Sequence, residues 1–172
     1  MKNLHLLAIS VGMSIGSAAM AEPSVTLYGI LDGGVSVSKL QHQSAKVQMT
    51  NGNWLSNRWG LMGQEDLGGG NSVFFKLEKG FNLSNGSEAT AGKAFNRETA
   101  LGLSGEWGKL GLGRFGGLSS DCGTFSILGG AAYSTSFSTI GNMYGAFYLT
   151  DRYNNSVAYV TPDFVGLQGH LM

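Results

Sequence analysis

The chain has 172 residues, 28 of them glycine and 2 proline, with 13% charged residues and a formal net charge of zero. This composition excludes a nucleic-acid-binding function, because no excess or run of basic residues is present to hold a polyanion. A single cysteine, Cys122, excludes an internal disulfide framework. Glycine at this level disfavours helices, so the expected regular structure is β.

The first 21 residues have the features of an export signal. Lys2 supplies a positive start, an apolar run follows, and Ala19 and Ala21 frame a small-residue cleavage site. The apolar run is too short for a membrane-spanning helix. We therefore expect residues 1–21 to be a signal peptide, with the mature chain beginning near Glu22.

The remainder of the chain shows repeated period-two alternation, which predicts β-strands. In the first such segment, Val25, Leu27 and Leu31 alternate with mostly polar residues. The expected strands span residues 25–38, 57–65, 72–81, 95–104, 108–116, 151–161 and 166–172. Each has one largely apolar face, which could point either to a core or to lipid.

The lengths of the connections favour lipid. Long connections at 39–56, 82–94 and 117–150 alternate with short turns, as in outer-membrane barrels, whose periplasmic turns are short and whose outer loops are long. Strands of about 9 to 11 residues also match a tilted crossing of the bilayer. The predicted fold class is therefore all-β, a transmembrane antiparallel β-barrel.

In such a barrel the apolar row faces outward, toward lipid or a neighbouring subunit. The residues expected in this row are Leu27, Leu31, Trp59, Leu61, Val73, Phe75, Leu77, Leu110, Leu112, Val157 and Tyr159.

Five segments carry a resemblance to a known family. They are SVTLYGILDGGV (24–35), NRWGLMGQEDLGGG (57–70), FFKLEKGFNL (74–83), FNRETALGLSGEWGKLGLGR (95–114) and RYNNSVAYVTPDFVGLQ (152–168). In this order they resemble the N-terminal half of the trimeric general-diffusion porins of Gram-negative outer membranes.

The resemblance implies a 16-stranded barrel, a homotrimer in outer-membrane lipid, and passive diffusion of ions and small hydrophilic solutes. It also implies no enzymatic activity and no cofactor. Residues 22–172 would form the N-terminal part of the barrel, about six and a half strands, so the chain is interpreted as truncated. The third outer loop, about 117–150, would fold into the pore.

The same resemblance assigns candidate residues of the pore constriction. Arg58, Arg97 and Arg152 match the family's basic cluster, and the facing acid is Asp121, with Asp151 as an alternative. By alternation, Arg58 lies on the face opposite the apolar row. Arg152 is an even number of residues from the polar Ser156 and so falls on the same face as it, and both arginines are expected to point inward. Arg97 is an even number of residues from Leu101 and Leu103, so alternation would place it on the apolar face. Its expected inward direction follows from the resemblance alone.

Two further residues are candidates for the subunit interface. Arg114 matches an arginine that in the family receives the second loop of a neighbouring subunit, and Glu88 in that loop is its expected partner.

The residues alone leave two other classes of protein as alternatives. An exported soluble β-sandwich that binds a ligand would bury the apolar faces instead of exposing them to lipid. An enzyme in a smaller barrel would need a nucleophile and base, but His42 and His170 have no such arrangement around them. Neither the histidines nor Cys122 have metal-ligand spacing, so no metal site is expected.

Overall fold

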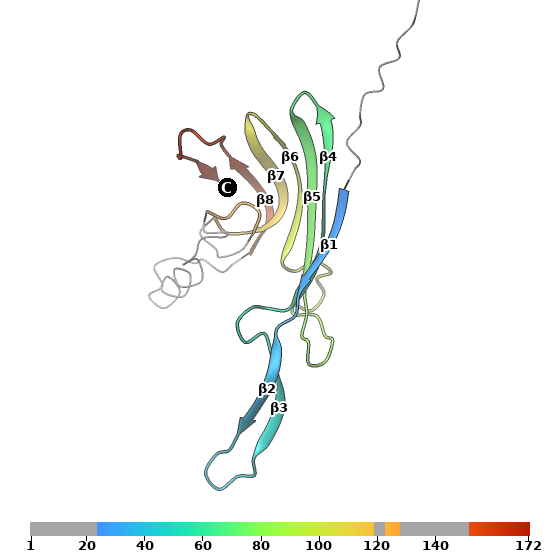
Figure 1. The fold of residues 1–172 in the computed structure, drawn as a ribbon, viewed down its shortest axis with the longest axis vertical. Helices are drawn as coiled ribbons and strands as arrows, with labels where there is room; N and C mark the ends of the chain where they lie inside the picture. Colours follow the sequence, from blue (N-terminus) through green and yellow to red (C-terminus); the bar gives the residue numbers. More distant parts are fainter. Residues whose placement is uncertain (1–23, 119–122, 128–151) are drawn as a thin grey trace, which may run out of the picture.

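A computed structural model describes residues 24–118, 123–127 and 152–172. The predicted signal peptide and most of the predicted third loop lie outside these residues. Seven strands form one antiparallel sheet in the order β1-β4-β5-β6-β7-β8-β9, and β2 and β3 form a separate hairpin (Figure 1). The bounds are β1 Ser24–Ile30, β2 Gly33–Ser38, β3 Lys46–Asn51, β4 Arg58–Gly68, β5 Asn71–Gly80, β6 Glu98–Gly105, β7 Gly108–Gly116, β8 Arg152–Val160 and β9 His170–Leu171.

Short and long connections lie at opposite ends of the sheet. Figure 1 shows the β4–β5, β6–β7 and β8–β9 connections at one end, and the long segments 31–57 and 81–97 at the other. We call these the short-turn end and the long-loop end. This segregation agrees with the alternation of connection lengths in the sequence. Among the described residues there is no helix of the length and apolarity that a membrane crossing requires.

The first predicted strand, 25–38, is not continuous. β1 ends at Ile30, and the chain continues into the β2–β3 hairpin, which projects from the long-loop end (Figure 1). Asp32 marks the break, because its carboxylate accepts hydrogen bonds from the backbone N–H of Trp54 and of Leu55, both at 2.7 Å. Asn57 holds the same point, exchanging hydrogen bonds with the backbone N–H and carbonyl of Asp32. Period-two alternation continues through this break, so it could not be seen in the sequence.

Other strand limits also differ from the prediction. β3 lies inside the segment 39–56, which the sequence predicts as a connection, and β4 extends to Gly68 instead of 65. β6 begins at Glu98 instead of residue 95, because Asn96 turns its side-chain oxygen to the backbone N–H of Gly80 at 2.8 Å. The last segment, predicted as a strand from 166, is extended only at His170–Leu171, after a bridge between Phe164 and Leu167.

The register of the sheet sorts side chains onto two faces. We call inner the face against which residues 123–127 of the third connection pack, and outer the opposite one. Leu27, Leu101 and Leu112 lie on the outer face with exposed fractions of 69%, 58% and 53%. Large aliphatic side chains left this open on several adjacent strands are typical of a surface that meets lipid or another subunit, as the sequence predicted.

The buried cluster of the described residues lies on the inner face. It comprises Phe74, Ala100, Phe115, Phe125, Ala158 and Val160. Glycines make room for its rings: a Cβ at Gly102 would lie 2.5 Å from Cε1 of Phe74, and one at Gly111 would lie 2.6 Å from Cε2 of Phe125. The small residues at these positions thus let the third connection pack directly on the sheet.

Candidate functional site

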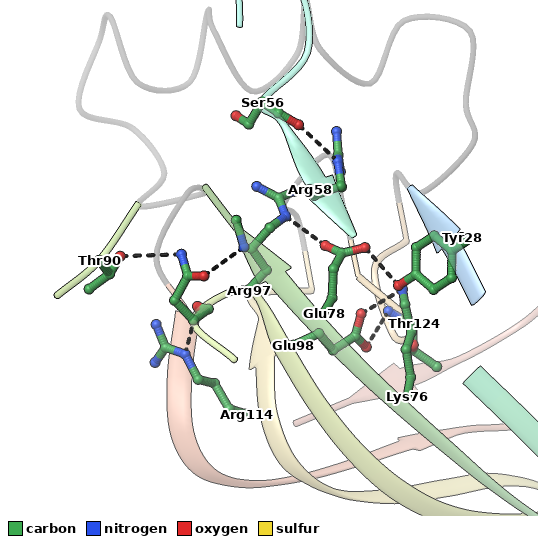
Figure 2. A network of polar contacts seen from close by, with 12 residues as sticks. Tyr28, Ser56, Arg58, Lys76, Glu78, Thr90, Arg97, Glu98, Arg114 and Thr124 are labelled. Atoms are coloured by element: carbon green, nitrogen blue, oxygen red, sulfur yellow. Dashed lines mark hydrogen bonds and ion pairs between the residues drawn. The ribbon is translucent and has the colours of Figure 1, made fainter. Parts of the chain in front are cut away.

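The inner face near the long-loop end carries a network of charged and polar side chains (Figure 2). Glu78, on β5, is its centre: its carboxylate binds Nε of Arg97 at 2.6 Å and accepts a hydrogen bond from the Tyr28 hydroxyl at 2.9 Å. Tyr28 and Glu78 are separated by β4, where Gly60 lies between them in the register. A Cβ at Gly60 would lie 2.7 Å from the Tyr28 hydroxyl oxygen, so glycine is what allows the side chain to cross.

A second pair joins β5 to β6. Nζ of Lys76 is 2.7 Å from Oε2 of Glu98, whose side chain is only 3% exposed. Oε1 of Glu98 accepts a hydrogen bond from the backbone N–H of Thr124 at 2.9 Å. Glu98 therefore connects the sheet wall to the third connection, a charge-assisted contact that is stronger than one between neutral groups.

Phe125 extends this attachment. Its ring is 1% exposed and packs on Phe115 with ring centroids 4.8 Å apart. Its carbonyl oxygen accepts a hydrogen bond from Nδ1 of His170 at 3.1 Å. Residues 123–127 are thus held on this face of the sheet by a backbone contact, a buried ring and a histidine. The inward folding of the third connection as a whole stays a prediction. Of that connection, Asp121 and Asp151 lie outside the described residues.

The predicted basic residues occupy different positions. Arg58 follows the alternation: it starts β4 opposite Ile30 and Gly80, and its Nε donates to the carbonyl of Ser56 at 3.1 Å. Arg97 lies just before β6, where the strand geometry has not yet begun, and its side chain therefore reaches Glu78 despite its parity. The structure thus brings Arg97 onto the inner face in a buried ion pair.

The parity argument for Arg152 does not hold across β8. Its register against β7 shifts between Gly113 and Phe115, and Asn155 has a left-handed φ of 52°, both marks of a β-bulge. An extra residue in a strand moves later or earlier side chains to the opposite face. The alternation that relates Arg152 to Ser156 is therefore broken, and the direction of the Arg152 side chain remains a prediction.

The two residues predicted at a subunit interface do not contact each other within one chain. Arg114 pairs with Thr99 in the register, and its guanidinium donates to the carbonyls of Asn96 and Arg152 and to Oδ1 of Asn154. It thus ties together the long-loop ends of three strands. Glu88 binds Nζ of Lys79 at 2.7 Å, and this ammonium group lowers the pKa of the Glu88 carboxyl.

Sequence reasoning missed Tyr28, Lys76, Glu78 and Glu98. A signal was present, since Lys76 and Glu78 alternate with apolar residues in FFKLEKGF. The pattern does not predict which residue pairs with each charge, because the partner comes from another part of the chain. Lys109 and Phe125 gave no signal, because an isolated lysine and a loop phenylalanine are common in any sequence.

The described residues of this face border several hollows, of which we consider two. One of about 330 Å³ is lined by Thr26, Gln64, Lys76, Lys109 and Thr124 among others, and one of about 420 Å³ by Lys109, Thr124 and His170 among others. Within the described ranges, no group of three or more His, Cys, Asp or Glu side chains is placed to hold a metal ion. The charged side chains of this face pair with one another, Arg97 with Glu78 and Lys76 with Glu98.

Comparison with known proteins identifies the family. The family model for Gram-negative porins matches residues 7–172. The chain is 37% identical to an outer membrane porin protein of Bordetella pertussis and 34% identical to outer membrane porin protein 32 of Delftia acidovorans, covering 95% and 94% of this chain and 46% of each relative. It is 31% identical to major outer membrane protein P.IB of Neisseria meningitidis, over 88% of this chain and 44% of that protein.

A solved structure agrees with this result. The anion-selective porin from Comamonas acidovorans superposes with a TM-score of 0.58 at 28% identity, over 86% of this chain and 45% of that one. The sheet therefore corresponds to about half of a porin barrel, and the chain spans just under half the length of these relatives. This excludes the soluble β-sandwich and enzyme alternatives, because porins are non-enzymatic channel proteins. The chain belongs to the Gram-negative porin family.

Proposed function

We propose that the protein forms a water-filled channel in the bacterial outer membrane through which ions and small hydrophilic solutes diffuse passively. The observation that carries this proposal is the opposition of the two faces: an exposed aliphatic outer face, and an inner face with ion pairs and hollows. A polar interior and an apolar exterior are what a channel in lipid requires. Export by a signal peptide at 1–21 would bring the chain to that membrane.

The experiment is a recording of single channels from protein extracted from outer membranes and added to a planar bilayer at high salt. Discrete, long-lived steps of conductance support the proposal. A membrane fraction that contains the folded protein and yields no steps would contradict it.

We place the constriction at the long-loop half of the inner face, formed by Arg58, Arg97 and Arg152 with Asp121 of the third connection opposite. Opposed charges across a narrow gap orient polar solutes and slow apolar ones. The position of Arg58 on the inner face supports this arrangement. Arg97 lies on the same face, but its charge is compensated by Glu78, so Arg58 is the residue to test first. Neutralising Arg58 should change the ratio of anion to cation permeability, and an unchanged ratio would exclude it from the constriction.

The proposed assembly is a homotrimer, with Arg114 and Glu88 at the interface. The exposed outer-face leucines support a partner surface. Because Glu88 already binds Lys79 in its own chain, a contact with a neighbouring Arg114 would be made in addition to this pair. The variant Glu88→Gln should lower the temperature at which trimers dissociate on gels, while a trimer that dissociates at the same temperature would remove Glu88 from the interface.

A further inference from the structure

Two basic side chains of the inner face are bound to carboxylates. Arg97 is bound to Glu78 at 2.6 Å, and Lys76 to Glu98 at 2.7 Å. An ion in the lumen meets each of these pairs as a dipole, whose field falls off faster with distance than that of a single charge. These pairs therefore contribute little to the preference of the lumen for anions or cations.

Lys109 has a different environment. It lies on β7 opposite Ser104 and Val160, near the short-turn end of the sheet. Its Nζ is 4.3 Å from the ring centroid of Phe74 and 5.6 Å from that of Phe125. Within the described part of the chain, no carboxylate forms an ion pair with Lys109. Aromatic rings stabilise a cation through their quadrupole but carry no net charge, so they do not compensate the charge of Lys109. The Glu98 carboxylate interacts with Lys109 electrostatically, but it is bound to Lys76 at 2.7 Å.

This ammonium group also borders open space. Lys109 and Thr124 line both hollows, the one of about 330 Å³ and the one of about 420 Å³. Ser104 also lines the first, so two residues with hydroxyl groups, Ser104 and Thr124, border the same space as the ammonium. The two rings hold the cation in place and occupy one side of it, while the hollows leave room for a small anion on another.

We propose that Lys109 is a binding station for small anions, carboxylates and halides, and a determinant of the channel's ion preference. The inference rests on the proposed channel function and extends it. Anions passing the short-turn half of the lumen bind transiently to the Lys109 ammonium, assisted by the hydroxyls of Ser104 and Thr124, and cations are depleted there.

The size of the effect follows from Coulomb's law. A unit charge about 10 Å from an ion in water changes the local concentration of that ion about twofold, upward for anions and downward for cations. Screening at about 0.1 M salt reduces this. Removing the charge of Lys109 should therefore lower the anion-to-cation permeability ratio by about two- to fourfold.

The test is the reversal potential of single channels under a potassium chloride gradient. Lys109→Gln should lower the permeability ratio by this factor, and Lys109→Arg should retain it. Lys46→Gln is the matched control, because Lys46 is exposed on the projecting hairpin and the same charge is lost. Open channels of Lys109→Gln with the wild-type ratio would overturn the inference while leaving the channel function intact.

A second measurement does not require conductance. Lysines of the detergent-solubilised protein are dimethylated with ¹³C, which keeps their charge, and acetate is added at constant ionic strength. The Lys109 signal, assigned by its absence in Lys109→Arg, should shift saturably, and that of Lys46 should not. A Lys109 signal that does not shift would overturn the proposed anion binding. This outcome is independent of the channel recordings, because the measurement does not require conductance.

Discussion

Replacing Gly111 by alanine should displace the third connection from the inner face. The added Cβ would lie 2.6 Å from Cε2 of Phe125 and closer still to Cζ, and both belong to a ring that is 1% exposed and packed on Phe115. A Cβ on β7 cannot move away, because Gly111 is paired on both sides, with Gly102 and Ala158. The ring must therefore leave its place.

The cost can be worked out from the burial of Phe125. Burying a phenylalanine side chain stabilises a protein by about 1.5–3 kcal/mol relative to leaving it exposed. Losing about 2 kcal/mol from the attachment should raise the population of the detached segment roughly 30-fold, since 1.4 kcal/mol corresponds to a factor of ten. The Thr124 amide, bound to Glu98 when attached, reports this population directly.

The assay is hydrogen exchange of residues 123–127 in the detergent-solubilised protein, followed by mass spectrometry. Gly111→Ala should accelerate exchange of the Thr124 amide about 30-fold. A double-mutant cycle with Phe125→Ala isolates the cause, because alanine at 111 has no ring to displace once Phe125 is gone. If Gly111→Ala accelerates exchange by the same factor with and without the Phe125 ring, the steric reasoning is refuted.

Three further predictions concern other parts of the chain. Glu78→Gln leaves Arg97 buried without its carboxylate and should destabilise the folded protein in urea by about 3 kcal/mol; an unchanged midpoint would show that the pair is solvated. Leu27→Arg on the outer face should cost about 2–4 kcal/mol in lipid, whereas Thr26→Arg, on the inner face, should be tolerated; equal costs would contradict the assignment of faces. Hydrogen bonds from the Leu55 and Trp54 amides lower the pKa of Asp32, so its stabilisation of the hairpin is present above the unfolded pKa of about 3.9 and is lost as the pH falls through the lowered value. The protection factor of these amides, which is the intrinsic exchange rate divided by the observed rate, should fall at low pH in the wild type. An identical pH profile in Asp32→Asn would rule this out.

The face assigned to each side chain could largely be read from the sequence. Successive side chains of a strand alternate between faces, so a run such as FFKLEKGF places Phe75 and Leu77 on one face and Lys76 and Glu78 on the other without knowledge of the fold. The alternation fails where the strand geometry stops. Arg97 reaches the inner face from a position before β6, and the bulge at Asn155 breaks the count that relates Arg152 to Ser156.

The sequence by itself determined the all-β class, the positions of the sheet's strands to within a few residues at most ends, the apolar outer row and the alternation of long and short connections. All of these depend on residues that are neighbours in the chain. Only the tertiary structure decided which charges pair and where the third connection is attached. Tyr28 reaches Glu78 across Gly60, and Phe125 packs on Gly111, because strand register and ring packing bring together residues that are far apart in sequence. No local pattern encodes those distances.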